Sequence, residues 1–245
     1  IHSFPIDPTA DTLSLYVAWL CTYIKPKSVD TYLSAISSEL EDLYPDVRKN
    51  RRSALVKNTL TGAKKRFGTD TNRKDPLAIE DVISVCESLI GPSHDDLLFM
   101  ALLLCAFYGV HRLGELVDHD RPDLRDSNKN IKRTSVKFYE KDECISYWLP
   151  KHKADALFAG SEVVIKKLHD DLDPVPIVRR YISSRDSRFP LHYQLFLTSA
   201  GNPPTRAWFM RRFRRHFTGN VSGHSPRSGA ATFLATLGWP RDLIQ

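Results

Sequence analysis

The chain has 245 residues, of which 42% are hydrophobic and 26% are charged, and its formal net charge is +6. These proportions are ordinary for a soluble globular protein, and no apolar run approaches the roughly 20 residues of a transmembrane helix. The cysteines at positions 21, 86, 105 and 144 are too scattered for a zinc site or a disulfide scaffold, which favours a reducing intracellular compartment. Because the sequence begins without methionine or a secretory leader, we expect an internal part of a longer protein.

The first part of the chain is predicted to be helical, because apolar residues recur there at spacings of three and four. The expected helices cover residues 13–20, 29–43 and 55–65. Ser28 is the expected N-cap of the second helix. Residues 68–76 are polar, rich in turn formers and closed by a proline, so we place a linker there. The predicted domains are a helical one over residues 1–74 and a second one over residues 75–245.

The second domain is predicted to be mainly helical with a small sheet. Helices are expected over residues 79–89, 97–108, 176–184, 205–217 and 225–237. The helix over 97–108 is apolar enough to lie at the centre of a core. Segments rich in β-branched or aromatic residues and separated by charged turns predict antiparallel strands over residues 131–139, 144–149 and 162–165. The expected fold class is therefore mainly α, of the α+β kind.

Basic residues gather in three patches, which points to an extended polyanion such as nucleic acid. The candidate DNA contacts are Arg51, Arg52, Lys57, Lys64 and Lys65 in the first domain and Arg206, Arg211, Arg212 and Arg215 in the second. The helix over 205–217 also carries Phe209, Phe213 and Phe217 on one stripe, so part of it packs as core. Simple solvation is the alternative explanation of the charged faces.

Two segments place an arginine where a packed scaffold can fix it. Residues 108–116 read Tyr-Gly-Val-His-Arg-Leu-Gly-Glu-Leu and put Arg112 just after the apolar helix. Residues 223–229 read Gly-His-Ser-Pro-Arg-Ser-Gly, in which Ser225 is the expected N-cap. His224 and Arg227 are then at a helix N-terminus, which favours an anion. Taken singly, each segment is explained as well by a surface arginine, the first paired with Glu115.

Together, in this order and on a helical background, the segments resemble the Arg-x-Gly-Glu-Leu and His-x-x-Arg boxes of the tyrosine recombinases. The resemblance covers nearly the whole chain, because that family has a helical DNA-clamping domain first and a sheet between the two boxes. The amino-acid sequences of the two segments most resemble those of recombinases from fungal mobile elements of the crypton or DIRS-like kind. The resemblance implies recombination or integration of double-stranded DNA in the nucleus, with self-association on DNA. It implies no membrane, no metal and no small-molecule cofactor.

The resemblance also implies a transesterification, in which a tyrosine attacks a DNA phosphate, forms a 3′-phosphotyrosyl link and frees a 5′-hydroxyl. Arg112 and Arg227 then stabilise the charge on the phosphate oxygens, His224 assists proton movement, and Glu115 supports Arg112. The family uses a lysine from a β-hairpin as general acid. Lys153 is expected to have this role rather than Lys151, because it lies nearer the start of the returning strand.

The nucleophile has no candidate in this sequence. The family places a further His or Trp and then the tyrosine on helices after the His-x-x-Arg box, and the sequence ends at Gln245 before them. The tyrosines at positions 108, 147, 181 and 193 all lie upstream and are better explained as core or surface residues. A noncatalytic DNA-binding protein derived from a recombinase is the alternative function. An unrelated helical regulator is a third possibility, and it predicts that Arg112 and Arg227 lie far apart.

Overall fold

A computed structural model describes residues 7–68, 73–139, 141, 143–151 and 159–240. The chain divides into two compact units, Ile1–Asn72 and Arg73–Gln245. Among the residues described, no helix is both long and apolar enough to span a lipid bilayer.

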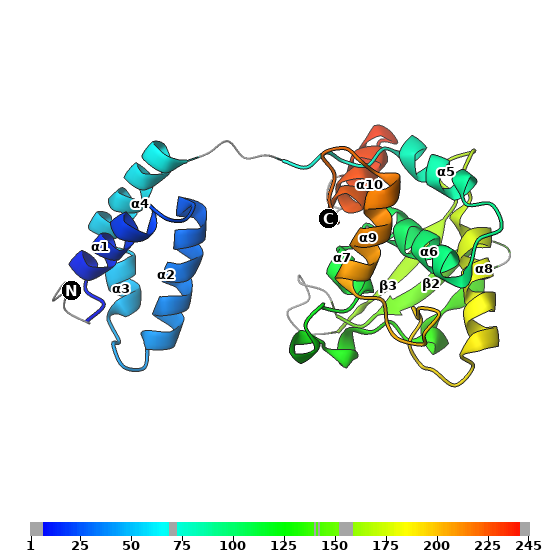
Figure 1. Ribbon diagram of the computed structural model, residues 1–245, viewed down its shortest axis with the longest axis horizontal. Coiled ribbons are helices and arrows are strands. Elements are labelled where there is room, and N and C mark those ends of the chain that lie inside the picture. Colours follow the sequence, from blue (N-terminus) through cyan, green and yellow to red (C-terminus); the bar gives the residue numbers. More distant parts are fainter. Residues whose placement is uncertain (1–6, 69–72, 140, 142, 152–158, 241–245) are drawn as a thin grey trace. The chain divides into compact units, whose positions relative to one another are not determined.

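The first unit is helical (Figure 1). Its helices are α1 (Ala10–Leu20), α2 (Pro26–Leu40), α3 (Val47–Arg51) and α4 (Ala54–Phe67). The apolar stripes predicted from the sequence meet in a small core that includes Val17, Leu33 and Val56. The expected N-cap at Ser28 is wrong: α2 begins at Pro26, because proline suits the first turn of a helix and is buried there.

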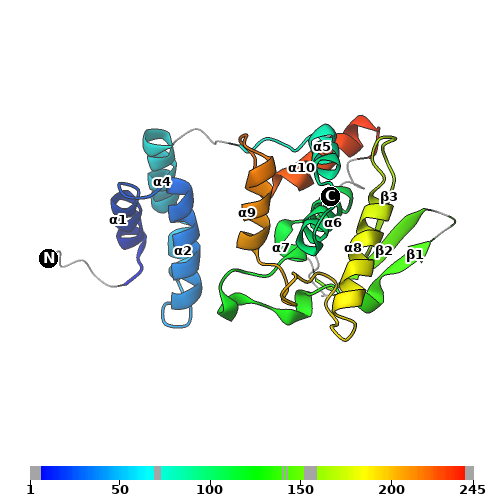
Figure 2. The same ribbon diagram turned by 45° about the vertical axis from the view of Figure 1, so that its right-hand side comes forward.

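The second unit is built around one buried helix. Its helices are α5 (Ile79–Ser88), α6 (His94–Tyr108), α7 (Leu113–Leu116), α8 (Pro174–Arg188), α9 (Arg206–His216) and α10 (Ser225–Thr236). Every residue of α6 from Leu97 to Tyr108 is buried, and α5, α8, α10 and β3 (Ser161–Lys166) pack around it. The second view shows α8 running beside the sheet (Figure 2). The predicted fold class, mainly α with a small antiparallel sheet, is confirmed.

The sheet has the order β1-β2-β3, with β1 (Lys137–Tyr139) and β2 (Cys144–Leu149) antiparallel and β3 antiparallel to β2. The strand expected over residues 131–139 is wrong in its first half. Arg133–Ser135 form a 3-10 turn. The Trp148 N–H donates to the Ser135 hydroxyl there, whereas in a regular strand pair it would donate to a backbone carbonyl. Ile131 accepts instead from the backbone of Leu195.

Helix α10 lies against the segment that leads into α5. The Leu77 N–H donates to the Ser225 carbonyl at 3.0 Å, and a Cβ on Gly229 would collide with the Leu77 carbonyl oxygen. We expect Gly229→Ala to lower the stability of the second unit by about 1–3 kcal/mol, because the obstacle is backbone and cannot swing aside. Thermal unfolding checks this as a Tm lowered by several degrees.

The matched control is Gly219→Ala in the same unit, where an added Cβ meets nothing within 4 Å. That change is expected to alter stability by less than about 0.5 kcal/mol. Equal Tm values for the two variants contradict the close approach of α10 to Leu77.

Candidate functional site

The chain between α6 and α7 makes a tight turn that sends two neighbouring side chains in opposite directions. Val110 has a φ of +50°, a conformation that β-branched residues rarely adopt. His111 is buried in the core, whereas the Arg112 side chain remains 36% exposed. A strained turn of this kind is typical of a site where geometry matters more than stability.

Arg112 is held by Glu115, one turn along α7. The Arg112 N–H donates to Glu115 Oε2 at 2.9 Å, and its Nη1 donates to Oε1 at 3.2 Å. Burial alone would raise the pKa of the Glu115 carboxyl, but hydrogen bonds from His111 and Arg112 lower the pKa to about 2. Glu115 is therefore a carboxylate at neutral pH and fixes the direction of the guanidinium.

Arg227 comes from the other end of the unit. It lies in the first turn of α10, and its Nη1 donates to the Val110 carbonyl. The expected N-cap at Ser225 is wrong: His224 occupies that position, because the Ser225 hydroxyl accepts from the Ser222 N–H at 2.8 Å. His224 itself is exposed at the start of the helix.

The two arginines line one cavity of about 980 Å³, together with Glu115 and residues of β3. Burial, followed by the nearby charge of Arg112, lowers the pKa of Arg227, and Glu115 acts in the opposite direction. The positive charges of the two guanidiniums repel each other, so the cavity is suited to an anion that contacts both arginines.

Of the other two expected catalytic residues, His224 and Lys153, only His224 is among the residues that the structure describes. His224 is not among the residues that line this cavity, although it is only one turn before Arg227. Lys153 lies outside the described residues. Lys151, the alternative in the same turn, lies 3.6 Å from the Asp126 carboxylate, measured from its Nζ.

The tyrosines near the site have other roles in the fold. Tyr108 lines the cavity, but its hydroxyl donates to the Leu172 carbonyl at 3.3 Å, and burial raises its pKa. The hydroxyl of Tyr147 contacts His111, and that of Tyr181 donates to the Leu195 carbonyl. Tyr193 is exposed and does not line the cavity. None of these four tyrosines presents its hydroxyl to the arginine pair.

The basic residues expected on α9 differ in their surroundings. Arg206, Arg211 and Arg215 are exposed. Arg212 is bound within the protein, because it lies 2.7 Å from Asp96 and 3.3 Å from Asp95 at the start of α6 and covers the Trp208 ring. In the expected stripe, Phe209 and Phe213 are buried, and Phe217 is partly buried against the same core. The exposed side of α9 is therefore basic.

The first unit has a smaller basic hollow of its own. Arg51, Arg52 and Lys57 line a pocket of about 250 Å³ between α2, α3 and α4. Asp30 lies in the same pocket and pairs with Arg51 and Lys64 at 3.4 and 3.5 Å, so it offsets part of the charge. Lys65, next to Lys64 on α4, is exposed.

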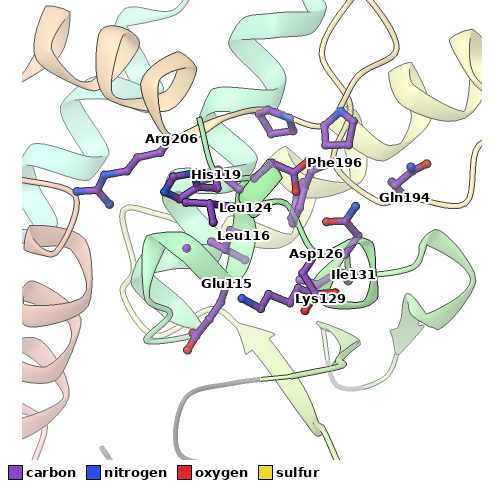
Figure 3. Close-up of a pocket in the computed structure, with 16 residues that line it drawn as sticks. Glu115, Leu116, His119, Leu124, Asp126, Lys129, Ile131, Gln194, Phe196 and Arg206 are labelled. Atoms are coloured by element: carbon purple, nitrogen blue, oxygen red, sulfur yellow. The ribbon is translucent and has the colours of Figure 1, made fainter. Parts of the chain in front are cut away.

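A further pocket of about 290 Å³ is lined by residues of α7 and of the segment that follows it (Figure 3). Glu115 borders it, but the figure shows its side chain pointing away from His119 and Arg206. Asp118 and Asp126 also line this pocket. These carboxylates make it less suited to a phosphate than the arginine cavity.

Sequence reasoning missed His111 and Tyr147, which lie behind Arg112 in the core. A histidine directly after an apolar helix was the only signal, and it reads equally well as a surface residue. The contact depends on β2, whose position relative to α6 is a tertiary feature that local patterns do not specify.

No protein-family model matches the sequence, and no curated protein matches it either. Solved structures do resemble the chain. The XerH site-specific recombinase bound to difH substrate, in a pre-cleavage complex, is similar over 91% of this chain, with a TM-score of 0.50 and 14% identity. The XerA recombinase is similar over 91% of the chain, with a TM-score of 0.50 and 16% identity. The chain spans 63% of the XerH chain and 73% of the XerA chain, and the likeness establishes a tyrosine recombinase fold.

Proposed function

We propose that this protein is a site-specific recombinase or integrase, which cuts and rejoins double-stranded DNA through a 3′-phosphotyrosyl intermediate. The proposal rests on one feature of the site: Arg112 and Arg227, from distant parts of the sequence, line the same cavity. An unrelated helical regulator gives no reason for this convergence. The fold shared with XerH and XerA supports the same reading.

In the proposed reaction a tyrosine oxygen attacks the phosphorus and the bond to the 5′-oxygen breaks. Negative charge on the two non-bridging oxygens rises in the transition state, and the two guanidiniums stabilise it with paired N–H donors. A guanidinium, as a rule, carries its positive charge at neutral pH. His224, at the start of the same helix as Arg227, assists proton movement. The hairpin lysine, Lys153, protonates the leaving 5′-oxygen.

We further propose that the protein serves a mobile element of the fungal crypton or DIRS-like kind, acts in the nucleus and assembles on DNA as several protomers. The assignment to such a mobile element is supported by the amino-acid sequence of residues 108–116 and 223–229. The nucleus and the assembly follow from that relationship. DNA as the partner is also supported by the basic hollow of the first unit and the basic face of α9.

DNA binding is expected to weaken steeply with salt, because contacts to phosphates release condensed counterions. Arg215→Ala should reduce affinity about equally for all duplex sequences and lower the slope of log K against log salt by roughly 1, the loss of one phosphate contact. Fluorescence anisotropy with a labelled duplex over a series of KCl concentrations measures both quantities.

Arg188→Ala is the control, because Arg188 is an exposed arginine at the end of α8 and lines none of the three cavities described above. It should leave the slope unchanged. Binding that does not depend on salt contradicts the proposed phosphate contacts.

A further inference from the structure

A histidine that the proposed reaction does not use lies buried behind the two arginines. His111 is 3% exposed and directly precedes Arg112. Its Nδ1 lies 3.3 Å from Glu115 Oε2, and its Nε2 lies 2.8 Å from the Tyr147 hydroxyl. The imidazole also stacks on the Tyr147 ring, with 5.8 Å between ring centroids. Both ring nitrogens therefore have partners, and one partner is the carboxylate that holds Arg112.

The chemistry of the carboxylate fixes the direction of the bond from His111. Glu115, whose pKa is lowered to about 2 despite its burial, is a carboxylate that can only accept, so His111 Nδ1 donates to it. Burial keeps the pKa of the Tyr147 hydroxyl well above its ordinary value, so this hydroxyl keeps its proton and remains a neutral partner of Nε2.

Glu115 uses its two oxygens differently. Oε2 receives the Arg112 backbone N–H and His111 Nδ1, whereas Oε1 receives the Arg112 guanidinium. Two donors on one oxygen resist rotation of the carboxylate, so the other oxygen meets the guanidinium in a fixed direction. His111 supplies one of these two donors.

The backbone around His111 also contacts the second arginine. A Cβ on Gly109 would lie 2.6 Å from the imidazole Cδ2, so the ring fits only because residue 109 has no side chain. Val110, in its left-handed conformation, turns its carbonyl to Arg227. The turn that seats the imidazole therefore touches both arginines.

We propose that His111, seated by Tyr147, is a positioning residue that holds the Glu115 carboxylate and, through it, the Arg112 guanidinium in the geometry that receives a phosphate. The inference rests on the proposed function for the identity of the anion. Without the bond from Nδ1, the carboxylate is free to rotate and the guanidinium loses its fixed direction.

The test compares His111→Leu, which keeps the volume and removes the donor, with His111→Asn, whose amide nitrogen can take the place of Nδ1. Titration of the Glu115 carboxyl followed by ¹³C NMR is the first measurement, and binding of inorganic phosphate is the second. His111→Leu should raise the Glu115 pKa by roughly one unit or more. It should weaken phosphate binding about 3- to 10-fold, the effect of one hydrogen bond, and His111→Asn should restore most of both.

His94→Leu is the matched control, because His94 is also buried, and its ring bonds Ser184 and the Leu197 carbonyl. It should lower stability without changing the Glu115 titration or phosphate binding. Tyr147→Phe, which keeps the ring and removes only the hydroxyl, should shift both measurements in the direction of His111→Leu.

An unchanged Glu115 titration in both His111→Leu and Tyr147→Phe overturns the proposal, and so does a His111→Asn protein that behaves like His111→Leu. A wild-type chain that binds neither phosphate nor DNA contradicts the proposed function instead. The Glu115 titration then still decides whether His111 holds the carboxylate.

Discussion

Replacing Arg227 with alanine is expected to slow DNA cleavage by the full natural gene product by a factor on the order of 10²–10³, the effect of removing one preorganised donor to a transition-state oxygen. Arg227 is part of the rigid core of the site, since its Nη1 is anchored on the Val110 carbonyl and its helix packs against Leu77. Water that enters in its place cannot supply a fixed positive charge.

Arg227→Lys should recover only part of the loss, because lysine keeps the charge but not the planar pair of donors. Arg112→Ala is expected to match Arg227→Ala, and the double variant should cost less than the product of the two, since the guanidiniums act on one phosphate. Single-turnover cleavage of a labelled duplex measures these rates, with Arg188→Ala as the control. An Arg227→Ala protein that cleaves at the wild-type rate contradicts the assigned role, and EDTA should leave the rate unchanged.

The sequence predicted the parts of the fold that depend on local patterns. The apolar run of α6 and the strand β2, which carries Ile145, Tyr147 and Trp148, were found nearly at their observed limits. Helix α6 is buried on all sides from Leu97 onward, which leaves an unbroken hydrophobic segment in the sequence. The strand expected from residue 131 was half wrong. Its first residues form an isolated antiparallel bridge instead, in which Ile131 and Arg133 bond the backbone of Leu195 and Tyr193, partners that no local pattern reveals.

For the site, as for the fold, the sequence predicted the features that depend on local patterns. Arg112 and Arg227 could be selected because each follows a recognisable helix boundary, and Glu115 because it is one turn from Arg112. Arg212 and Arg211 look alike in the sequence, yet only Arg212 meets Asp95 and Asp96 across the fold. Such differences arise from tertiary contacts between segments far apart in the chain.

The 245-residue chain is expected to bind DNA and to form no covalent adduct with it. The arginines can stabilise a transition state but cannot replace the attacking oxygen. Tyr108 is the one tyrosine that lines their cavity among the residues described, and its hydroxyl is turned to the Leu172 carbonyl. A denaturing gel with a labelled, nicked duplex measures the adduct, and binding of the same duplex under native conditions is the control.

An adduct formed by this chain contradicts the expectation and makes one of its own tyrosines the nucleophile, which Tyr108→Phe then tests first. The full natural gene product, given the terminal DNA of the proposed mobile element, decides between the two functions. A 3′-phosphotyrosyl adduct that Arg227→Ala suppresses identifies a recombinase. Binding without an adduct by the full gene product favours a noncatalytic DNA-binding protein, in which the arginine pair still holds a phosphate but no tyrosine attacks it.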